Sequence, residues 1–285
     1  MHLESKEDFQ LVFELSTKQG WLAHRLQELM HLLFSECNTD QKRKLIVELL
    51  GRFTYISNEK YSQLIEYLVD GIIGIQGLTD EACQIVAMAA DSSSDSSQRV
   101  LYDLKMLFER RGWRKYRHVN QFSAAYRTYK QSPKHNNIVL IDEFIGSGQS
   151  AIGRVDEIKR QFANAGVADY KVYIRVLAGM REGVQRVRDS GIDVEALVLL
   201  DKGITDLSPA EQVSDQLEIM RDLEKNLLPV YNEKDMPSIG YGQMESLYTR
   251  DGGSTPNNVF PIFWWPFILD GSERPVLLHR AMGDA

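Results

Sequence analysis

The sequence predicts an α/β fold, in which a parallel sheet is flanked by helices, with an N-terminal helical region and an irregular, aromatic-rich C-terminal tail. Between residues 85 and 200, short apolar runs alternate with amphipathic segments, which is typical of a parallel sheet covered by helices. Between Leu22 and Leu33, leucines recur at three- and four-residue spacing, as on the buried face of a helix. Beyond Asp201 the alternation stops. We therefore expect the sheet in the middle of the chain.

These observations set the expected domain boundaries. We expect a helical region at residues 1–80, the α/β core at residues 81–205, and a C-terminal region at residues 206–285 that completes the domain. The C-terminal region opens with an acidic helix at residues 208–228. From residue 232 it is rich in glycine, proline and aromatic residues, which indicates irregular structure or short strands.

The N-terminal region is expected to form a small helical bundle or a helical cover. Thr39 and Asp40 are suited to cap one helix, and Ser57 or Asn58 can cap the next. The apolar residues that these helices would bury are Leu45, Ile46, Leu49 and Leu50 in the first, and Tyr61, Leu64, Ile65 and Leu68 in the second. Nothing in this region has a catalytic pattern.

The α/β core begins with a buried strand at residues 85–90. Its further strands are predicted at residues 116–122, 137–142, 171–177 and 196–200. The helices between them are predicted after a cap at Asp95 or Ser96, from about Ser150 to Gly166, and at residues 182–189. Ligands of such sheets bind beyond the carboxyl ends of the strands.

Charge and hydropathy exclude several classes of function. The 285 residues carry a net charge of −7, whereas a protein that coats nucleic acid needs a basic surface. Nucleic acid is therefore not indicated as a partner, although residues 101–135 carry nine Lys or Arg against two acids and can form a local basic face. The apolar runs at residues 69–75 and 259–269 are shorter than the roughly 20 residues of a membrane span. We expect a soluble, cytoplasmic protein without a membrane partner.

Cysteines and histidines predict no metal site. Cys37 and Cys83 are far apart and belong to no ligand cluster, so two reduced thiols are the simplest interpretation. His24 and His31 are two helical turns apart but lack a third ligand. We expect no metal that is held by protein ligands alone.

One segment has a pattern with chemical meaning. The apolar run at residues 138–141 ends in the adjacent acids Asp142 and Glu143, and a loop of small residues then opens a helix. The loop residues are Gly146, Ser147, Gly148, Gln149 and Ser150. Glycines allow a tight turn whose N–H groups face an anion, serines add hydroxyl donors, and the helix N-terminus adds unpaired N–H groups. The segment therefore predicts a phosphate-binding loop beside two carboxylates that can accept hydrogen bonds from vicinal sugar hydroxyls.

This segment resembles the phosphoribosyl pyrophosphate motif of type I phosphoribosyltransferases, in which an apolar strand, two acids and a hydroxyl-rich glycine loop follow one another. Asp142 and Glu143 match the acidic pair. Ser147, Gly148 and Ser150 match the loop, and Gly146 stands where a hydroxyl residue is common. The resemblance implies that the acids are the catalytic pair, holding the ribose 2′- and 3′-hydroxyls, and that the loop holds the 5′-phosphate. The alternative is a purely structural tight turn, which is frequent in doubly wound folds.

The same resemblance implies a loop after the first strand that contacts pyrophosphate. Asp91, Ser92, Ser93 and Ser94 occupy this position, and their hydroxyls can act as donors. Family members often have a basic residue there, but the nearest in this chain is Arg99. The alternative is a solvated linker that leads into the next helix.

Family members also close a flexible, often basic loop over pyrophosphate. Its candidate residues are Arg127, Lys130 and Lys134, and Lys202 after the fifth strand is a further cation that can face the site. The alternative is that these charges lie on a solvated surface. Without a cation that grips pyrophosphate, catalytic competence stays open.

The C-terminal tail offers a candidate for base recognition. Its aromatic segment at residues 260–265 can stack on a nucleobase, and Asn257 and Asn258 can read a base edge. The alternative is that these aromatics form a packed core. With the helical front and the acidic helix, the tail resembles phosphoribosyltransferase-like proteins of bacterial conflict systems. That resemblance implies an anti-phage defence partner protein, such as a nuclease, an ATPase or a reverse transcriptase.

The resemblance implies an enzyme of the phosphoribosyltransferase (glycosyltransferase) type that depends on Mg²⁺ bound through the substrate pyrophosphate. The phosphoribosyl group would pass to a base, a nucleotide, a macromolecule or water, and hydrolysis would deplete the metabolite, which suits a toxin. The alternatives are a catalytically inactive module that senses a nucleotide and regulates a partner protein, and a scaffold subunit with a degenerate site.

Overall fold

The computed structural model describes residues 6–90 and 95–284, which divide into two compact units. One unit consists of residues 58–200, and the other combines the chain up to residue 57 with the chain from residue 201. These boundaries differ from the expected regions 1–80, 81–205 and 206–285. The helix that begins at Asn58 packs on the sheet, whereas the C-terminal region shares a core with the N-terminal helices.

The unit at residues 58–200 is built on a five-stranded parallel sheet in the order β3-β2-β4-β5-β6. The strands are β2 (Cys83–Ala87), β3 (Arg117–Val119), β4 (Asn137–Ile145), β5 (Lys171–Met180) and β6 (Asp193–Leu200). Each predicted strand overlaps one of these. The predicted parallel α/β architecture is confirmed.

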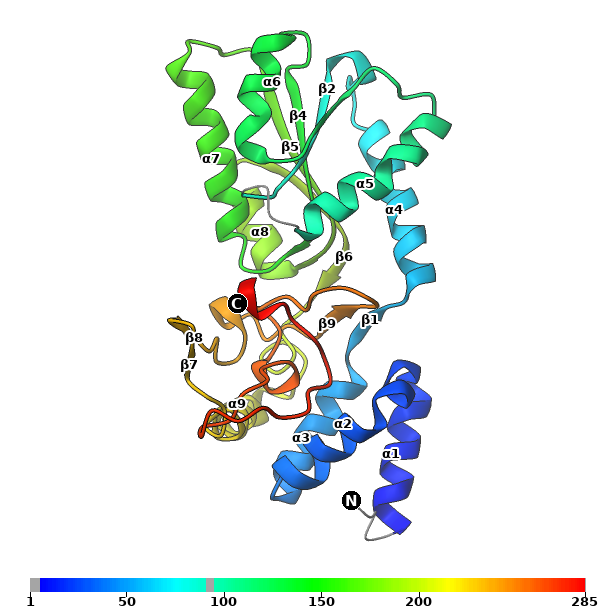
Figure 1. The fold of residues 1–285 in the computed structure, drawn as a ribbon, viewed down its shortest axis with the longest axis vertical. Helices are drawn as coiled ribbons and strands as arrows, with labels where there is room; N and C mark the ends of the chain where they lie inside the picture. Colours follow the sequence, from blue (N-terminus) through cyan, green and yellow to red (C-terminus); the bar gives the residue numbers. More distant parts are fainter. Residues whose placement is uncertain (1–5, 91–94, 285) are drawn as a thin grey trace. The chain divides into compact units, whose positions relative to one another are not determined.

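Helices cover both faces of this sheet (Figure 1). They are α4 (Asn58–Ile73), α5 (Ser96–Arg110), α6 (Ala125–Gln131), α7 (Gln149–Asn164) and α8 (Arg181–Asp189), with 3₁₀ turns at Asp80–Ala82 and Phe122–Ala124. α4 and α5 pack together on one face, and α6, α7 and α8 pack on the other. Because both faces are covered, β4 is buried along most of its length, which explains its nearly continuous apolar run.

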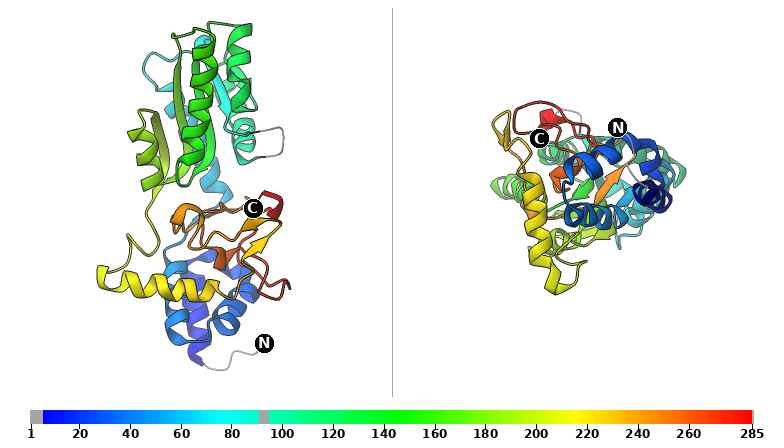
Figure 2. Two further views of the ribbon diagram at one scale, coloured as in Figure 1. Left: turned by 90° about the vertical axis from the view of Figure 1, so that its left-hand side faces the viewer. Right: turned by 90° about the horizontal axis from the view of Figure 1, so that it is seen from below.

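The second unit combines helices from the start of the chain with the C-terminal region. Its helices are α1 (Lys6–Lys18), α2 (Leu26–His31), α3 (Asp40–Gly51) and α9 (Ala210–Glu224), with a π turn at Leu32–Glu36 and 3₁₀ turns at Gly20–Arg25, Tyr241–Gln243, Pro261–Phe263 and Met282–Asp284. Its strands are β1 (Thr54–Ile56), which pairs in parallel with β9 (Tyr248–Arg250), and β7 (Val230–Tyr231), which pairs antiparallel with β8 (Lys234–Asp235). α9 crosses α3 (Figure 2), and Lys42 forms an ion pair of 2.8 Å with Asp222 there.

The aromatic tail forms the core of this second unit. Trp264 and Trp265 are each 1% exposed and lie in one apolar cluster with leucines of α3. Arg274 ties the tail to the N-terminal helices, because its guanidinium donates two hydrogen bonds of 2.7 Å to Glu36 and others to the carbonyls of Ile262 and Trp265. These tryptophans are core residues, as the alternative interpretation of the tail predicts.

Local signals define several helix ends. Thr39 caps α3 by accepting a hydrogen bond from the Lys42 N–H, and Asp95 caps α5 by accepting one of 2.6 Å from the Ser97 N–H. α7 differs, because Gly148 precedes it in the left-handed conformation and gives it no side-chain cap. Over the described residues, no helix is both long and apolar enough to cross a membrane.

Candidate active site at the sheet switch point

The strand order places a crevice between the carboxyl ends of β2 and β4. After β2, the chain passes through α5 on one face of the sheet and enters β3, which lies on one side of β2. β4 lies on the other side of β2, and after β4 the chain passes through α7 on the opposite face. Connections that diverge in this way open a crevice at the sheet edge, where ligands of doubly wound sheets bind. β2 ends at Ala87, opposite Ile141, whereas β4 continues to Ile145. Asp142 and Glu143 therefore lie within β4, just beyond the end of β2.

Asp142 is a buried carboxylate with few partners. One carboxylate oxygen accepts hydrogen bonds from the Ser96 hydroxyl at 3.1 Å and from the Glu143 N–H at 2.7 Å, and the other lies 3.8 Å from the Arg154 guanidinium. Burial raises the pKa of Asp142 to about 7, and the nearby carboxylate of Asp95 adds to this increase, while Arg154 opposes it. Near neutral pH the group is divided between its protonated and ionised forms.

Glu143 is also buried, and it points to the other face of the sheet. Successive side chains of a strand alternate between faces, so Glu143 lies with Ile141 on the side of α4 and α5, and Asp142 lies on the side of α7. The two carboxylates thus lie on opposite faces of β4, just beyond the end of β2.

The loop after β4 has the geometry of an anion-binding turn. Gly148 adopts a left-handed conformation with φ of +80°, and its carbonyl accepts a hydrogen bond from the Ile152 N–H. Gln149 and Ser150 follow as exposed residues of the first turn of α7. Gly148 offers no side-chain cap, and within the described part of the chain no cap hydrogen bond is recorded at this helix start, so its first N–H groups and the positive end of its dipole can face a ligand.

Helix α8 supports this loop through backbone contacts. A Cβ at Gly183 would lie 1.8 Å from the Gly146 carbonyl oxygen, and a Cβ at Gly148 would lie 2.5 Å from the Gly183 carbonyl oxygen. Arg186 of α8 also donates a hydrogen bond of 2.8 Å to the carbonyl of Ser147, which is buried. Helix α8 therefore packs closely against the loop, and only glycine fits at positions 148 and 183.

Comparison with known proteins identifies the family. The sequence signature of the PRTase-CE family matches residues 24–271. The chain belongs to the PRTase-CE family. It is thus a member of the type I phosphoribosyltransferase-like proteins, as the motif predicts. A comparison with functionally characterised proteins finds no significant match.

Solved structures give only distant likenesses. A xanthine-guanine-hypoxanthine phosphoribosyltransferase of Helicobacter pylori is 15% identical, with a TM-score of 0.33 over 52% of this chain and 86% of its own. An orotate phosphoribosyltransferase of Aeropyrum pernix is 14% identical, with a TM-score of 0.30 over 56% and 77%. A hypothetical protein of Neisseria gonorrhoeae with bound ppGpp is 10% identical, with a TM-score of 0.34 over 60% and 97%. Scores this low establish no relation by themselves.

The basic flexible loop expected in this PRTase-CE chain takes a different form. Arg127 and Lys130 lie on α6, with the Lys130 ammonium 5.6 Å from the centre of the Tyr126 ring. Lys134 lies before the start of β4, close enough to lower the pKa of Glu81 together with Lys115. Lys134 therefore lies at the amino end of the sheet, whereas the phosphate loop follows the carboxyl end of β4.

The pyrophosphate-loop candidates Asp91, Ser92, Ser93 and Ser94 lie outside the described residues. Their neighbour Ser96 is described, and it contacts Asp142 directly.

Three contributors to the site were not predicted from the sequence. The sequence predicts Ser96 only as a helix cap, and its pattern predicts neither Arg154 nor the support from Gly183 and Arg186 of α8. Arg154 lies one helical turn beyond Ser150, which places its side chain toward the same end of the sheet. This spacing is the only local signal for it, because the contact itself joins two separate elements.

The asparagines predicted to read a base edge lie in the second unit. The Asn258 amide donates a hydrogen bond of 2.8 Å to the Tyr241 carbonyl, and the Asn257 carbonyl accepts one from the Tyr241 N–H. Asn258 is buried, so its amide is committed to this loop.

Proposed function

We propose that the chain binds 5-phosphoribosyl pyrophosphate (PRPP), or a nucleotide that shares its ribose phosphate, at the crevice between β2 and β4, and that it transfers or hydrolyses the phosphoribosyl group. The observation that carries the proposal is the adjacency of two buried carboxylates and an uncapped helix N-terminus at the sheet switch point. Membership in the PRTase-CE family supports it.

The bound ligand would use the two halves of the site differently. The 5′-phosphate would accept hydrogen bonds from the first N–H groups of α7 and from the hydroxyl of Ser150. The vicinal ribose hydroxyls would donate to Asp142 and Glu143. An ionised Asp142 accepts a hydroxyl hydrogen bond more strongly than its protonated form does. Ligand binding would therefore release the proton that burial favours in the ligand-free protein.

The reaction would break the bond between ribose C1 and the pyrophosphate oxygen, and form one between C1 and the acceptor. Positive charge develops at C1 in such a displacement, and pyrophosphate leaves with the bonding electron pair. The buried carboxylates would orient the ribose and stabilise this charge, and the rigid loop would fix the phosphate.

Magnesium fits this arrangement only as an ion that binds together with the substrate. Among the described residues, no group of three or more His, Cys, Asp or Glu is placed to hold an ion. Mg²⁺ keeps several water and phosphate ligands and needs few from the protein, so Asp142 and Glu143 suffice as nearby hard oxygen donors. When bound, it would neutralise charge on the leaving pyrophosphate.

A second candidate function is a binding module that lacks turnover. It is favoured by the position of Lys134, a predicted pyrophosphate cation that lies before β4 at the amino end of the sheet. Such a module would sense a nucleotide and regulate a partner protein. A role in anti-phage defence rests on the sequence resemblance to conflict-system proteins, and is part of this proposal.

The test is isothermal titration of PRPP with Mg²⁺ into the wild type and into Asp142→Asn/Glu143→Gln. The matched control is Asp156→Asn/Glu157→Gln, the same pair of changes on the outer part of α7. We expect saturable binding to the wild type and to the control, and at least a tenfold weaker affinity in the site variant, or about 1.4 kcal/mol.

Turnover separates the two candidates. Pyrophosphate release from bound PRPP, with or without added bases and nucleotides, would establish an enzyme. Binding without release in the presence of any acceptor would favour the sensor. If the folded wild type takes up no PRPP, or the site variant binds as well as the control, the proposed site is wrong.

A further inference from the structure

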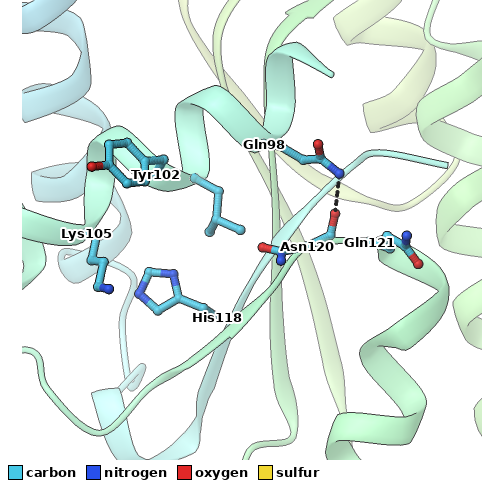
Figure 3. Close-up of a pocket in the computed structure, with 7 residues that line it drawn as sticks. Gln98, Tyr102, Lys105, His118, Asn120 and Gln121 are labelled. Carbon is cyan, nitrogen blue, oxygen red and sulfur yellow. Dashed lines mark hydrogen bonds between the residues drawn. The ribbon is translucent and has the colours of Figure 1, made fainter. Parts of the chain in front are cut away.

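A pocket of 520 Å³ lies between α5 and the edge strand β3, apart from the phosphate loop (Figure 3). It is lined by Gln98, Tyr102 and Lys105 of α5, by His118, Asn120 and Gln121 of β3 and the segment after it, and by the apolar side chain of Leu101. Its volume falls within the range of about 300–1,000 Å³ that is usual for small-molecule sites. None of the residues from Asp142 to Ser150 lines it.

The two ends of the pocket differ in chemistry. Lys105 and His118 lie near each other at one end, and Gln98, Asn120 and Gln121 gather at the other, where the Gln98 amide donates a hydrogen bond to the Asn120 carbonyl (Figure 3). No carboxylate is among the lining residues that the structure describes. The pocket therefore offers a cation at one end and amide groups at the other.

The charge of the pocket comes from Lys105. Desolvation lowers the pKa of His118, and the neighbouring ammonium of Lys105 lowers it further, so the imidazole is neutral at pH 7 and serves as a hydrogen-bonding group. A single cation with no opposing acid favours an anionic ligand.

An aromatic surface borders the same pocket. The Tyr102 side chain is 75% exposed, far more than a buried packing residue, and Leu101 beneath it is buried. In Figure 3 the Tyr102 ring lies near Lys105, and Gln98 is one helical turn away on α5. An exposed ring in a pocket that also holds amide groups is suited to a flat ring with polar edges, because stacking is available to any base and amides pair with base edges.

We propose that this pocket is a second ligand site, which binds a nucleotide with its base against Tyr102 and the amide groups and its phosphate on Lys105. The site is independent of the proposed phosphoribosyl site, since it uses other residues and lies across β2, on the side of β3. In a phosphoribosyltransferase-like chain, such a site can report nucleotide supply to the crevice beside it.

The test is a titration of the four nucleoside 5′-monophosphates, the matching nucleosides and inorganic phosphate into the full chain. Two variants probe the pocket, Lys105→Gln for the phosphate and Tyr102→Ala for the base. Their matched controls are Lys159→Gln on α7 and Tyr67→Ala on α4, which change an exposed lysine and an exposed tyrosine elsewhere. Circular dichroism of each variant verifies folding.

We expect at least one monophosphate to bind in a saturable manner and more tightly than its nucleoside. Lys105→Gln should weaken the monophosphate by about fivefold and leave the nucleoside unchanged, since an exposed charge pair contributes about 1 kcal/mol or less. Tyr102→Ala should weaken both by at least about fivefold, the low end of base stacking. Asp142→Asn/Glu143→Gln should retain the monophosphate binding that Lys105→Gln and Tyr102→Ala weaken, even if it no longer binds PRPP.

Three outcomes would overturn the second site. No monophosphate binds the folded wild type up to roughly 10 mM, the weak limit of a specific small ligand. Binding is lost in Asp142→Asn/Glu143→Gln and kept in Lys105→Gln, which would assign it to the phosphate loop. Inorganic phosphate alone reproduces the full affinity, which would show that no base is recognised.

Discussion

Two glycine loops of this molecule have similar backbone geometry but differ in their hydrogen bonding. Both contain a left-handed glycine pressed against another backbone, Gly148 against Gly183 in the sheet unit and Gly240 against Asn258 in the second unit. The second loop is the more strained, because Ile239 and Glu245 also have positive φ. Strain at non-glycine positions is often a feature of functional sites.

Hydrogen bonding separates the two loops. In the second unit, the buried carboxylate of Glu224 accepts hydrogen bonds from the Ser238 hydroxyl and the Ile239 N–H, and Glu245 accepts others from Ile204 and Thr205. The donors of that loop are therefore hydrogen-bonded to buried carboxylates of the same unit. The phosphate loop instead presents an uncapped helix N-terminus. Among the described residues, open donors rather than strain distinguish the loop that we propose to bind a ligand.

The strongest test of this comparison adds one methyl group at the close backbone contact of each loop. Gly183→Ala should cost about 3 kcal/mol of unfolding free energy, because the new Cβ would overlap the Gly146 carbonyl, and it should abolish PRPP binding. Gly240→Ala should cost a similar amount, since its Cβ would lie 2.0 Å from the Asn258 carbonyl oxygen, yet the folded fraction should bind PRPP normally. Urea denaturation and titration measure the two effects.

The control for these variants is Gly153→Ala in α7, where a Cβ meets nothing within 4 Å. It should be neutral or stabilising by up to about 1 kcal/mol, because alanine favours a helix. Normal stability and binding in Gly183→Ala would show that close packing against α8 does not shape the phosphate loop.

A second prediction uses the two buried carboxylates whose pKa burial raises to about 7, Asp142 and Glu224. Each holds its proton more tightly in the folded chain than in the unfolded chain. Their stabilising contribution is therefore full below about pH 4 and is lost as the pH rises through about 7, at about 1.4 kcal/mol for each unit of pKa difference. Both Asp142→Asn and Glu224→Gln should flatten the dependence of unfolding free energy on pH.

Binding should respond to only one of these groups. PRPP affinity should increase as the pH rises through about 7, with uptake of the released proton by the buffer, because Asp142 must ionise. Titration in buffers of different ionisation enthalpy measures this proton. Its release should vanish in Asp142→Asn and persist in Glu224→Gln, and persistence in both would remove Asp142 from the ribose site.

The smallest expected effect concerns Arg154. Arg154→Gln removes the cation 3.8 Å from the Asp142 carboxylate, so the pKa of Asp142 should increase further, and PRPP binding at pH 7 should weaken by up to about fivefold. The midpoint of the binding profile should move to higher pH. Lys159→Gln, also on α7, should leave that midpoint unchanged. A weaker affinity with an unshifted midpoint would mean that Arg154 contacts the ligand rather than tuning Asp142.

The sequence was most informative where structure depends on neighbouring residues. The strand at residues 137–141, the acids after it and the glycine loop are contiguous, and the cap at Asp95 depends on the next residues alone. β4 extends to Ile145, beyond its predicted end at Asp142, because Phe144 and Ile145 continue the pairing with β5 past the two acids. The predicted flexible loop at Arg127 and Lys130 is a helix, whose aromatic face packs on Phe162.

Contacts between distant segments were beyond such reasoning. The Ser96–Asp142 hydrogen bond and the approach of Gly183 to Gly146 depend on tertiary packing, which no local spacing encodes. The pairing of β1 with β9 joins Thr54 to Tyr248, although the whole sheet unit lies between these residues in the sequence. The assignment of the C-terminal region to the N-terminal helices could therefore not be read from residue patterns.

This chain order has a consequence for synthesis. α3 leaves the ribosome before the sheet unit, whereas its partners α9 and Trp264 leave after it. The sheet unit is contiguous and can fold as soon as it emerges, while the apolar face of α3, including Leu45 and Leu49, waits for residues made last. Nascent chains arrested before α9 should thus expose this face to chaperones, although their parallel sheet is already formed.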